Sequence, residues 1–311
     1  MREVVIGSRG SLLALSQARL VAQEILRQDA TQQVRTEIIR TTGDRISAGS
    51  LSGLDSTKAW FVKEIEEALL YGKIDLAVHS LKDLPGQLPD GLSIHAVPRR
   101  EDPRDALVSR HEVSSPDGLP SNPRLATGSL RRQVQLRLLR PDASIEPIRG
   151  NVDTRLRKLT EEGLDGLVLA AAGLKRIGRM DRISYLFSIE EMVPAIGQGA
   201  LAIEVRTDDL DIRKLVSCLD HEPSRLCANA ERTFLLKMGG SCQIPMGAHA
   251  WTENAKGWFA AFIAHPSGNE WLRRTRMGAS HELERLALQT ADEMLSQGAH
   301  RLLEACQGGS R

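Results

Sequence analysis

The stretch EVVIGSRGSLLALSQARLVAQEILRQ, residues 3–28, places a strand, a tight turn and a helix in direct succession. Residues 3–8 are mostly β-branched and apolar, which favours a buried strand. Residues 11–28 carry apolar side chains at helical spacing, and Ser11 stands where an N-cap is expected. The GSRGS turn, residues 7–11, therefore presents an arginine beside a helix N-terminus, an arrangement that suits anions.

The same alternation continues through the first hundred residues. Residues 34–42 alternate apolar and polar side chains as a half-buried strand does. Residues 58–72 have an amphipathic helical pattern that ends at Gly72, and residues 74–80 predict a short buried strand. Strands that alternate with helices imply an α/β fold with a largely parallel, doubly wound sheet.

Two polar, proline-containing breaks divide the chain, at residues 98–105 and 193–200. A second α/β unit is predicted between them. The strand expected at 201–206 has no helix close before it, so we expect it to pair back into the first unit. The last hundred residues carry helices, strand-like segments and a final helix at about 281–305, a pattern typical of an α+β unit. Length alone predicts about two domains.

Composition argues against several classes of protein. A net charge of +1 and 4% aromatic residues are poorly suited to binding nucleic acid by bulk charge or base stacking. The N-terminus has no signal-peptide pattern, and its longest apolar run, Leu12–Leu15, is too short to span a membrane. The four cysteines form no C-x-x-C pair and the histidines are scattered, so no metal site is expected. We therefore expect a cytoplasmic protein without nucleic-acid or membrane partners.

Basic residues gather in one part of the second α/β unit. Residues 124–158 hold nine basic and three acidic side chains, a net charge of about +6. Several of the arginines stand where helices are predicted to begin, with Ser129 and Asn151 as the expected N-caps. Guanidinium groups beside helix N-termini suit carboxylates or phosphates. The turn at residues 7–11 has the same design, so the two units together predict a small polyanionic ligand. A solvated helix face is the alternative for the arginines farther along each helix.

Residues 79–85, HSLKDLP, end a predicted strand with Lys82 and Asp83 side by side. An acid beside a cation at the carboxyl end of a strand is well placed for proton transfer or for stabilising a cationic intermediate. A plain surface turn ended by Pro85 is compatible with the same residue types.

One cysteine lies in a glycine-rich loop. GGSCQIPMG, residues 239–247, surrounds Cys242 with residues that break regular structure and favour exposure. The loop alone does not separate a nucleophile, a metal ligand or an attachment point from an inert thiol.

Nine segments, taken together and in order, resemble the porphobilinogen deaminase family: GSRGSLLALSQA, FVKEIEEALL, DLAVHSLKDLP, REDPRDAL, GSLRRQ, RGNVDTRL, LAAAGLKRIG, VPAIGQGALAIE and CQIP. They run through essentially the whole chain. The resemblance implies two periplasmic-binding-protein-like α/β domains joined by a double crossover, plus a small α+β C-terminal domain. Domain one would comprise residues 1–98 and 198–217, domain two residues 103–193, and domain three residues 220–311.

The resemblance also implies an activity. The family condenses porphobilinogen molecules head to tail with loss of ammonia, and hydrolysis then releases hydroxymethylbilane. Cys242 would hold a dipyrromethane cofactor through a thioether, as a primer that is not turned over. Asp83 would be the catalytic aspartate, and the enzyme would be a monomer.

Each pyrrole carries an acetate and a propionate, so the cofactor and the growing chain require several carboxylate sites. The residues that match the family's binding positions are Arg9, Ser11, Gln17, Lys58, Lys82, Thr127, Ser129, Arg131, Arg132, Arg149, Gly150, Arg155, Ala170 and Gln198. Three departures stand out. Only Lys58 remains of two lysines common before KAWF, Gly128 replaces a frequent serine, and Ser241 replaces a frequent glycine.

Two other classes of protein stay open on the residues alone. A two-lobed solute-binding module would bind a polycarboxylate without turnover, although Cys242 and the C-terminal α+β unit argue against it. A nucleic-acid-binding protein would rest only on the basic cluster at residues 124–158.

Overall fold

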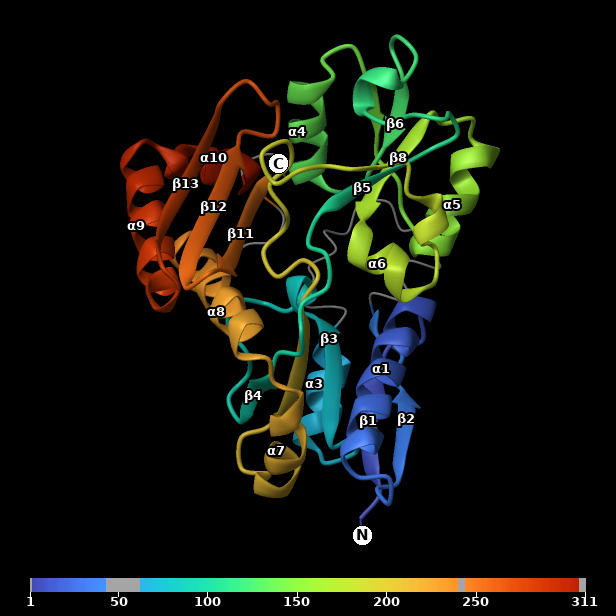
Figure 1. Cartoon of the computed structure of the whole chain (residues 1–311), viewed down its shortest axis with the longest axis vertical. Helices are drawn as coiled ribbons and strands as arrows, with labels where there is room; N and C mark the ends of the chain where they lie inside the picture. The colour runs from blue at the N-terminus through green and yellow to red at the C-terminus, as the bar shows by residue number, and fades with distance from the viewer. Residues whose placement is uncertain (1, 43–61, 240–243, 308–311) are drawn as a thin grey trace. The chain divides into compact units, whose positions relative to one another are not determined.

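The fold is described from a computed structural model, which covers residues 2–42, 62–239 and 244–307 (Figure 1). The chain forms two compact units, Met1–Glu101 with Ala200–Arg225, and Asp102–Gly199 with Leu226–Arg311. The polypeptide thus leaves the first unit after Glu101, returns to it at Ala200 and leaves it again. The division into three domains with the boundaries given above stays a prediction.

The first unit contains a five-stranded sheet in the order β2-β1-β3-β10-β4. The strands are Val34–Ile38, Val4–Ser8, Leu76–Ser80, Leu201–Arg206 and Leu92–Ala96. The expected return of residues 201–206 into this unit is confirmed. The expectation of a largely parallel sheet is confirmed for four of the five strands, whereas β10, between β3 and β4, runs antiparallel to both. Leu201 pairs with Ser80, the last residue of β3, so a strand that enters there must run back along β3.

Helices cover both faces of this sheet. α1 (Leu12–Gln28) and α7 (Leu210–Val216) pack on one face, and α3 (Lys63–Leu70) packs on the other. The alternation of side chains in β1 produces the two cores, since Val4 and Ile6 join the α1 core while Val5 joins the α3 core. Residues 58–61 of the helix expected at 58–72 lie outside the described residues.

The second unit contains a sheet in the order β7-β6-β8-β5-β9. The strands are Ser144–Glu146, Arg124–Ala126, Gly166–Ala170, Asp105–Ser109 and Tyr185–Leu186. β6 runs parallel to β7 and β8, whereas β5 is antiparallel to its neighbours. α5 (Val152–Glu161) and α6 (Ala171–Arg176) cover one face, and α4 (Leu130–Leu139) covers the other. The two α/β sheets that the sequence predicts are confirmed.

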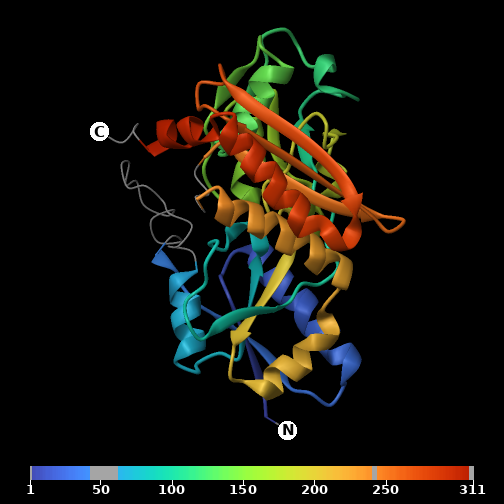
Figure 2. The ribbon, with the colours of Figure 1, turned by 90° about the vertical axis from the view of Figure 1, so that its left-hand side faces the viewer.

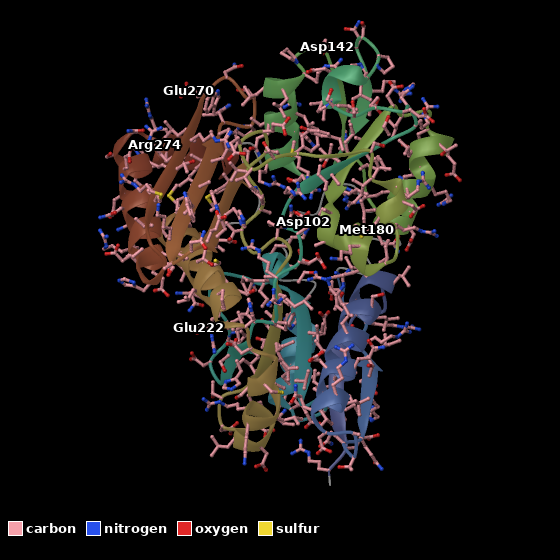
Figure 3. The ribbon with its side chains drawn as sticks, in the orientation of Figure 1. Asp102, Asp142, Met180, Glu222, Glu270 and Arg274 are labelled. Carbon is pink, nitrogen blue, oxygen red and sulfur yellow. The ribbon has the colours of Figure 1, made fainter. Side chains whose placement is uncertain are left out.

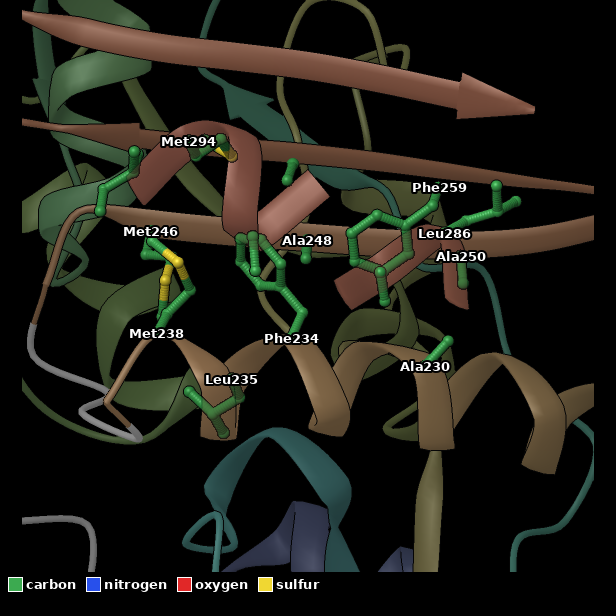
Figure 4. Close-up of a cluster of buried hydrophobic side chains, with 14 of the residues drawn as sticks. Ala230, Phe234, Leu235, Met238, Met246, Ala248, Ala250, Phe259, Leu286 and Met294 are labelled. Carbon is green, nitrogen blue, oxygen red and sulfur yellow. The ribbon is translucent and has the colours of Figure 1, made fainter. Parts of the chain in front are cut away.

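A third, antiparallel sheet also belongs to the second unit. It consists of β11 (Met246–Glu253), β12 (Lys256–Ala264) and β13 (Trp271–Ala279). α8 (Glu222–Lys237) and α9 (Leu283–Ser296) bury one face in a core that includes Phe234, Phe259 and Leu286 (Figures 2 and 4). The expected α+β character of the C-terminal part is confirmed.

The single final helix expected at 281–305 is wrong. The structure has a short 3-10 turn, then α9, and then a separate helix α10 (Ala299–Gln307). Gly298 separates the two helices with φ of +94°, a left-handed conformation that ends a helix and that glycine adopts without strain. The 3-10 turns of the chain include Leu81–Asp83, Pro116–Gly118, Met180–Arg182, Ser217–Leu219 and Ser280–Glu282.

Candidate functional site

The carboxyl edge of the first sheet gathers four of the predicted site residues. β1 and β3 are parallel neighbours, so the residues that follow them lie at the same edge of the sheet. Arg9 and Ser11 follow β1, and Lys82 and Asp83 follow β3 in the Leu81–Asp83 turn. All four are half-buried, which leaves part of each side chain open to solvent or to a ligand.

Hydrogen bonds fix this edge. The Ser11 hydroxyl accepts from the N–H of Ala14 at 3.3 Å, which confirms Ser11 as the N-cap of α1. Gln17, on the buried side of α1, donates from Nε2 to the Ser80 hydroxyl at 2.8 Å. Gln17 therefore ties α1 to the end of β3, and its predicted contact with a ligand stays a prediction.

The carboxyl edge of the second sheet gathers another group. β6, β7 and β8 are parallel, so the residues that follow each of them meet at one edge. The predicted residues at this edge are Thr127, Ser129, Arg149, Gly150, Arg155 and Ala170. Arg149 is exposed and Arg155 is half-buried. The arrangement presents two arginines beside the start of α5.

Asn151 caps α5, since its side-chain oxygen accepts from the N–H of Thr154 at 3.0 Å. Gly150 precedes it with φ of +114°, and a Cβ there would come within 2.8 Å of the Thr154 side chain. Arg155 donates from Nε to the Gly150 carbonyl at 2.8 Å, so the loop orients this guanidinium. The site thus depends on a backbone conformation that requires glycine.

The turn that leads into α4 is equally close-packed. Thr127 is buried and its hydroxyl donates to the Val168 carbonyl at 3.3 Å. A Cβ on Gly128 would lie 2.7 Å from the Ile148 carbonyl oxygen, so the backbone approach accounts for glycine at this departure from the family pattern. The Ser129 side chain makes no capping bond to the helix.

Arg131 and Arg132 lie at the start of α4, in a buried charge cluster around Asp105. Arg131 Nη1 is 2.7 Å from Asp105 Oδ2 and donates to the Val193 carbonyl at 2.6 Å. Arg132 donates from Nε to Asp105 Oδ1 at 2.8 Å and from Nη1 to the Val168 carbonyl at 3.2 Å. Asp105 is fully buried, and the two arginines are 3% and 6% exposed. Both guanidinium groups are thus largely engaged within the protein.

Attraction between opposite charges in this cluster offsets the free-energy cost of burying them. Burial alone would raise the pKa of Asp105, but the guanidinium groups of Arg131 and Arg132 hold it well below its usual range. Burial also lowers the pKa of Arg132, against the opposing attraction of Asp105. Arg131 Nε is buried and has no hydrogen-bond partner among the described residues. This N–H is the group in the cluster that a carboxylate ligand could satisfy.

The loop at residues 195–199 completes the cluster. Gln198 donates from Nε2 to Asp105 Oδ1 at 2.8 Å, and its side-chain oxygen accepts from Arg132 Nη2 at 3.2 Å. The N–H of Gly197 donates to Glu231 of α8 at 2.6 Å. Glu231 also accepts from the N–H of Ala250 in β11, so one buried carboxylate joins three segments of the second unit.

Two predicted residues, Lys58 and Cys242, lie outside the described residues. β11 starts shortly after Cys242, and its Gly247 is close-packed: a Cβ there would come within 2.9 Å of Arg131 Cδ. The third sheet therefore lies directly against the arginine cluster. Within the described ranges, no group of three or more His, Cys, Asp or Glu side chains is arranged to hold a metal ion.

Sequence reasoning missed Asp105 and Glu231 as members of this site. The signal available for Asp105 was an acid at the start of the apolar strand DALVS, where a buried charge needs a partner. For Glu231 no local signal existed, since its partners come from distant segments.

The chain matches two family models. One, described as "Porphobilinogen deaminase, dipyromethane cofactor binding domain", matches residues 4–214. The other, "Porphobilinogen deaminase, C-terminal domain", matches residues 225–296. Together they account for nearly the whole chain.

Relatives of known name agree with this assignment. Porphobilinogen deaminase of Syntrophobacter fumaroxidans is 43% identical over 303 residues and is covered over 97% of both chains. Porphobilinogen deaminase of Desulforudis audaxviator is 44% identical over 310 residues, with 99% of each chain covered. Among solved structures, the methionine binding protein MetQ gives a TM-score of 0.43 at 14% identity, over 70% of this chain and 89% of that one. None of the described helices could cross a membrane. On the family models and these relatives, the chain belongs to the porphobilinogen deaminase family.

Proposed function

We propose that this chain is an enzyme that condenses four porphobilinogen molecules head to tail and releases hydroxymethylbilane by hydrolysis. The family match over residues 4–214 and 225–296 carries the proposal. In each condensation a carbon–carbon bond to a pyrrole replaces the carbon–nitrogen bond of the aminomethyl group. Ammonia leaves the aminomethyl carbon, and the free pyrrole carbon that attacks it loses its proton. We expect the enzyme to work as a cytoplasmic monomer.

The cofactor proposed is dipyrromethane bound by a thioether to Cys242, which lies outside the described residues. When bound, this group supplies the free pyrrole carbon on which the chain is built. The polar groups of the second unit fit its carboxylates, because the buried N–H of Arg131 Nε has no partner in the described part of the chain and a charged acceptor would satisfy it. Arg149, Arg155 and Ser129 would add donors at the same sheet edge.

Arg132 and Gln198 have a more restricted role in this proposal. Their polar groups are bonded to Asp105, to the Val168 carbonyl and to each other, so they hold Arg131 and the edge in place. The Thr127 hydroxyl likewise donates its hydrogen bond to the Val168 carbonyl. We propose direct carboxylate contacts first for Arg131, Arg149 and Arg155.

In the first unit, Asp83 would accept hydrogen bonds from pyrrole N–H groups and stabilise the positive charge that develops as ammonia leaves. Its half-buried carboxylate strengthens that interaction relative to water. Lys82, Arg9 and Ser11 at the same edge would bind carboxylates and keep the reacting carbons together. Gln17 would hold the Ser80 end of β3, and with it the turn that carries Asp83.

The test is turnover of porphobilinogen by the purified chain. We expect four molecules of porphobilinogen consumed for each hydroxymethylbilane, with one ammonia released per porphobilinogen. Binding of porphobilinogen without release of ammonia would contradict the proposal and would favour the solute-binding alternative.

A further inference from the structure

Three ionisable side chains lie together in the α3 core of the first unit. His79 on β3 and Glu204 on β10 are hydrogen-bonded, with 2.9 Å between Nε2 and Oε2. Glu66 reaches the same layer from α3. Their exposed fractions are 5%, 0% and 8%, and apolar residues such as Leu69 and Ala77 make up the rest of this core.

The cluster contains two carboxyl groups and one imidazole. Glu66 Oε1 and Glu204 Oε1 are buried without a hydrogen-bond partner among the described residues. One imidazole can balance at most one carboxylate, so two ionised carboxylates would leave a net buried charge, which is costly. Burial, followed by the negative charge of Glu204, raises the pKa of Glu66 from 4.5 to about 7, against the opposing effect of His79.

Other ionisable groups on the surrounding elements are engaged elsewhere. Arg206, also on β10, donates to backbone carbonyls at the end of α3 and to Asp209. Glu64 on α3 accepts hydrogen bonds from a threonine. His95 on β4 lies 3.0 Å from a serine hydroxyl, and β1 has no ionisable side chain. Burial and then the charge of Glu204 therefore favour the protonated form of Glu66, and the other ionisable groups nearby have partners of their own.

The cluster lies directly before the turn that carries Asp83. His79 is followed by Ser80, the last residue of β3, and then by the Leu81–Asp83 turn. The N–H of Leu81 donates to the Ala200 carbonyl at the start of β10. The bond between His79 and Glu204 crosses the same two strands, so it fixes the strand pair from which the turn extends.

We propose that Glu66, His79 and Glu204 act as a positioning cluster, which holds the β3–β10 pair and the Lys82–Asp83 turn in place while buried Glu66 stays protonated. Loss of the Glu66 proton leaves an uncompensated buried charge and weakens the packing of α3 on the strand pair. The positioning part rests on the proposed role of Asp83, whereas the protonation of Glu66 does not.

The pH dependence has a definite sign. Glu66 is an acid whose pKa in the folded state, about 7, lies above its ordinary value of 4.5. Between these values the folded chain holds a proton that the unfolded chain has lost. The stability of the wild type therefore falls as pH rises through this window and levels off above it.

Thermal melting of the full chain between pH 5 and pH 8 tests the protonation of Glu66. Glu66→Gln keeps the shape of the side chain and cannot ionise. We therefore expect the melting temperature of this variant, relative to that of the wild type, to increase as pH rises to about 7. Glu67→Gln is the matched control, since Glu67 is the exposed neighbour on α3. Glu204→Gln removes the repelling charge and should reduce the pH-dependent loss. A melting difference between Glu66→Gln and wild type that is constant with pH would overturn the protonation of Glu66, and so would a pH dependence in Glu204→Gln equal to that of the wild type.

The pH profile of kcat tests the positioning role. We expect kcat of the wild type to fall as pH rises through about 7 and this limb to disappear in Glu66→Gln, with KM for porphobilinogen unchanged. An identical profile in an active Glu66→Gln enzyme would overturn the positioning role. An inactive wild type would count against the proposed function instead, and the melting comparison would still decide whether Glu66 is protonated.

Discussion

Asp83→Ala is expected to lower kcat for porphobilinogen by about 10²-fold or more, the size of effect seen when a preorganised charge-stabilising group is removed. Asp83 lies at the carboxyl edge of the first sheet beside Lys82, in a turn tied to β10 by the N–H of Leu81. Its carboxylate cannot be replaced by solvent without losing that fixed position. If the proposed dipyrromethane is assembled by the same condensation, loading of the cofactor should suffer as well.

Asp83→Asn separates charge from shape. If the carboxylate acts by its charge, the asparagine variant should be nearly as impaired as the alanine variant, with melting temperature unchanged. Asp90→Ala is the matched control, since Asp90 is exposed and follows the same turn. Near-normal formation of hydroxymethylbilane by Asp83→Ala would remove Asp83 from the mechanism.

Asp105→Asn is expected to destabilise the second unit by about 3–5 kcal/mol, because it leaves two buried guanidinium groups without a counter-charge. Asp105 is fully buried and binds Arg131, Arg132 and Gln198 at distances of 2.7 to 2.8 Å. Melting temperature should fall by roughly 10 °C. The variant should also load cofactor poorly, since Arg131 loses its orientation.

Protein stability at acidic pH provides a second measure of the contribution of Asp105. The pKa of Asp105 is held below its ordinary value of 3.8, so its contribution to stability is complete above pH 3.8 and is lost as pH falls below it. The melting temperatures of wild type and Asp105→Asn should therefore converge on acidification.

Asp181→Asn is the control for Asp105→Asn, because Asp181 is exposed in the same unit and should melt like the wild type. Asp142 would be a poorer control, because it pairs with Arg140 in the loop before β7 (Figure 3). Equal melting of Asp105→Asn and wild type at neutral pH would contradict the assigned charge cluster.

Local rules predicted the parts of the fold that depend on neighbours in sequence. The strand expected at residues 3–8 is β1, and the helix expected at 11–28 is α1. Of the three expected caps, Ser11 and Asn151 accept backbone N–H bonds, whereas Ser129 makes no capping bond. The direction of β10 escaped prediction because it depends on where the chain re-enters the first unit. The break at Gly298 escaped because a glycine inside a helical pattern is only a weak signal.

The residues of the candidate site likewise fall into those that the sequence predicts and those that it does not. Strand ends followed by Ser11, Asp83 or Arg149 were readable from the sequence, because parallel strands bring such ends to one edge. The partners of Arg131 and Arg132 were not readable, since Asp105 and Val193 come from segments distant in sequence. The sequence therefore indicated where arginines gather but not that two of them hold a buried carboxylate. The cluster of Glu66, His79 and Glu204 was hidden for the same reason, as its members come from three separate elements.

The most direct test of the account is the intact mass of the purified chain, produced in a cell with normal haem synthesis. The proposed tether at Cys242 predicts a wild-type mass increased by two linked pyrroles and a Cys242→Ala variant with the mass of the bare polypeptide. Cys218→Ala is the matched control, since Cys218 is an exposed free cysteine in the first unit and should leave the added mass in place. A soluble wild type with unmodified mass would contradict the central claim.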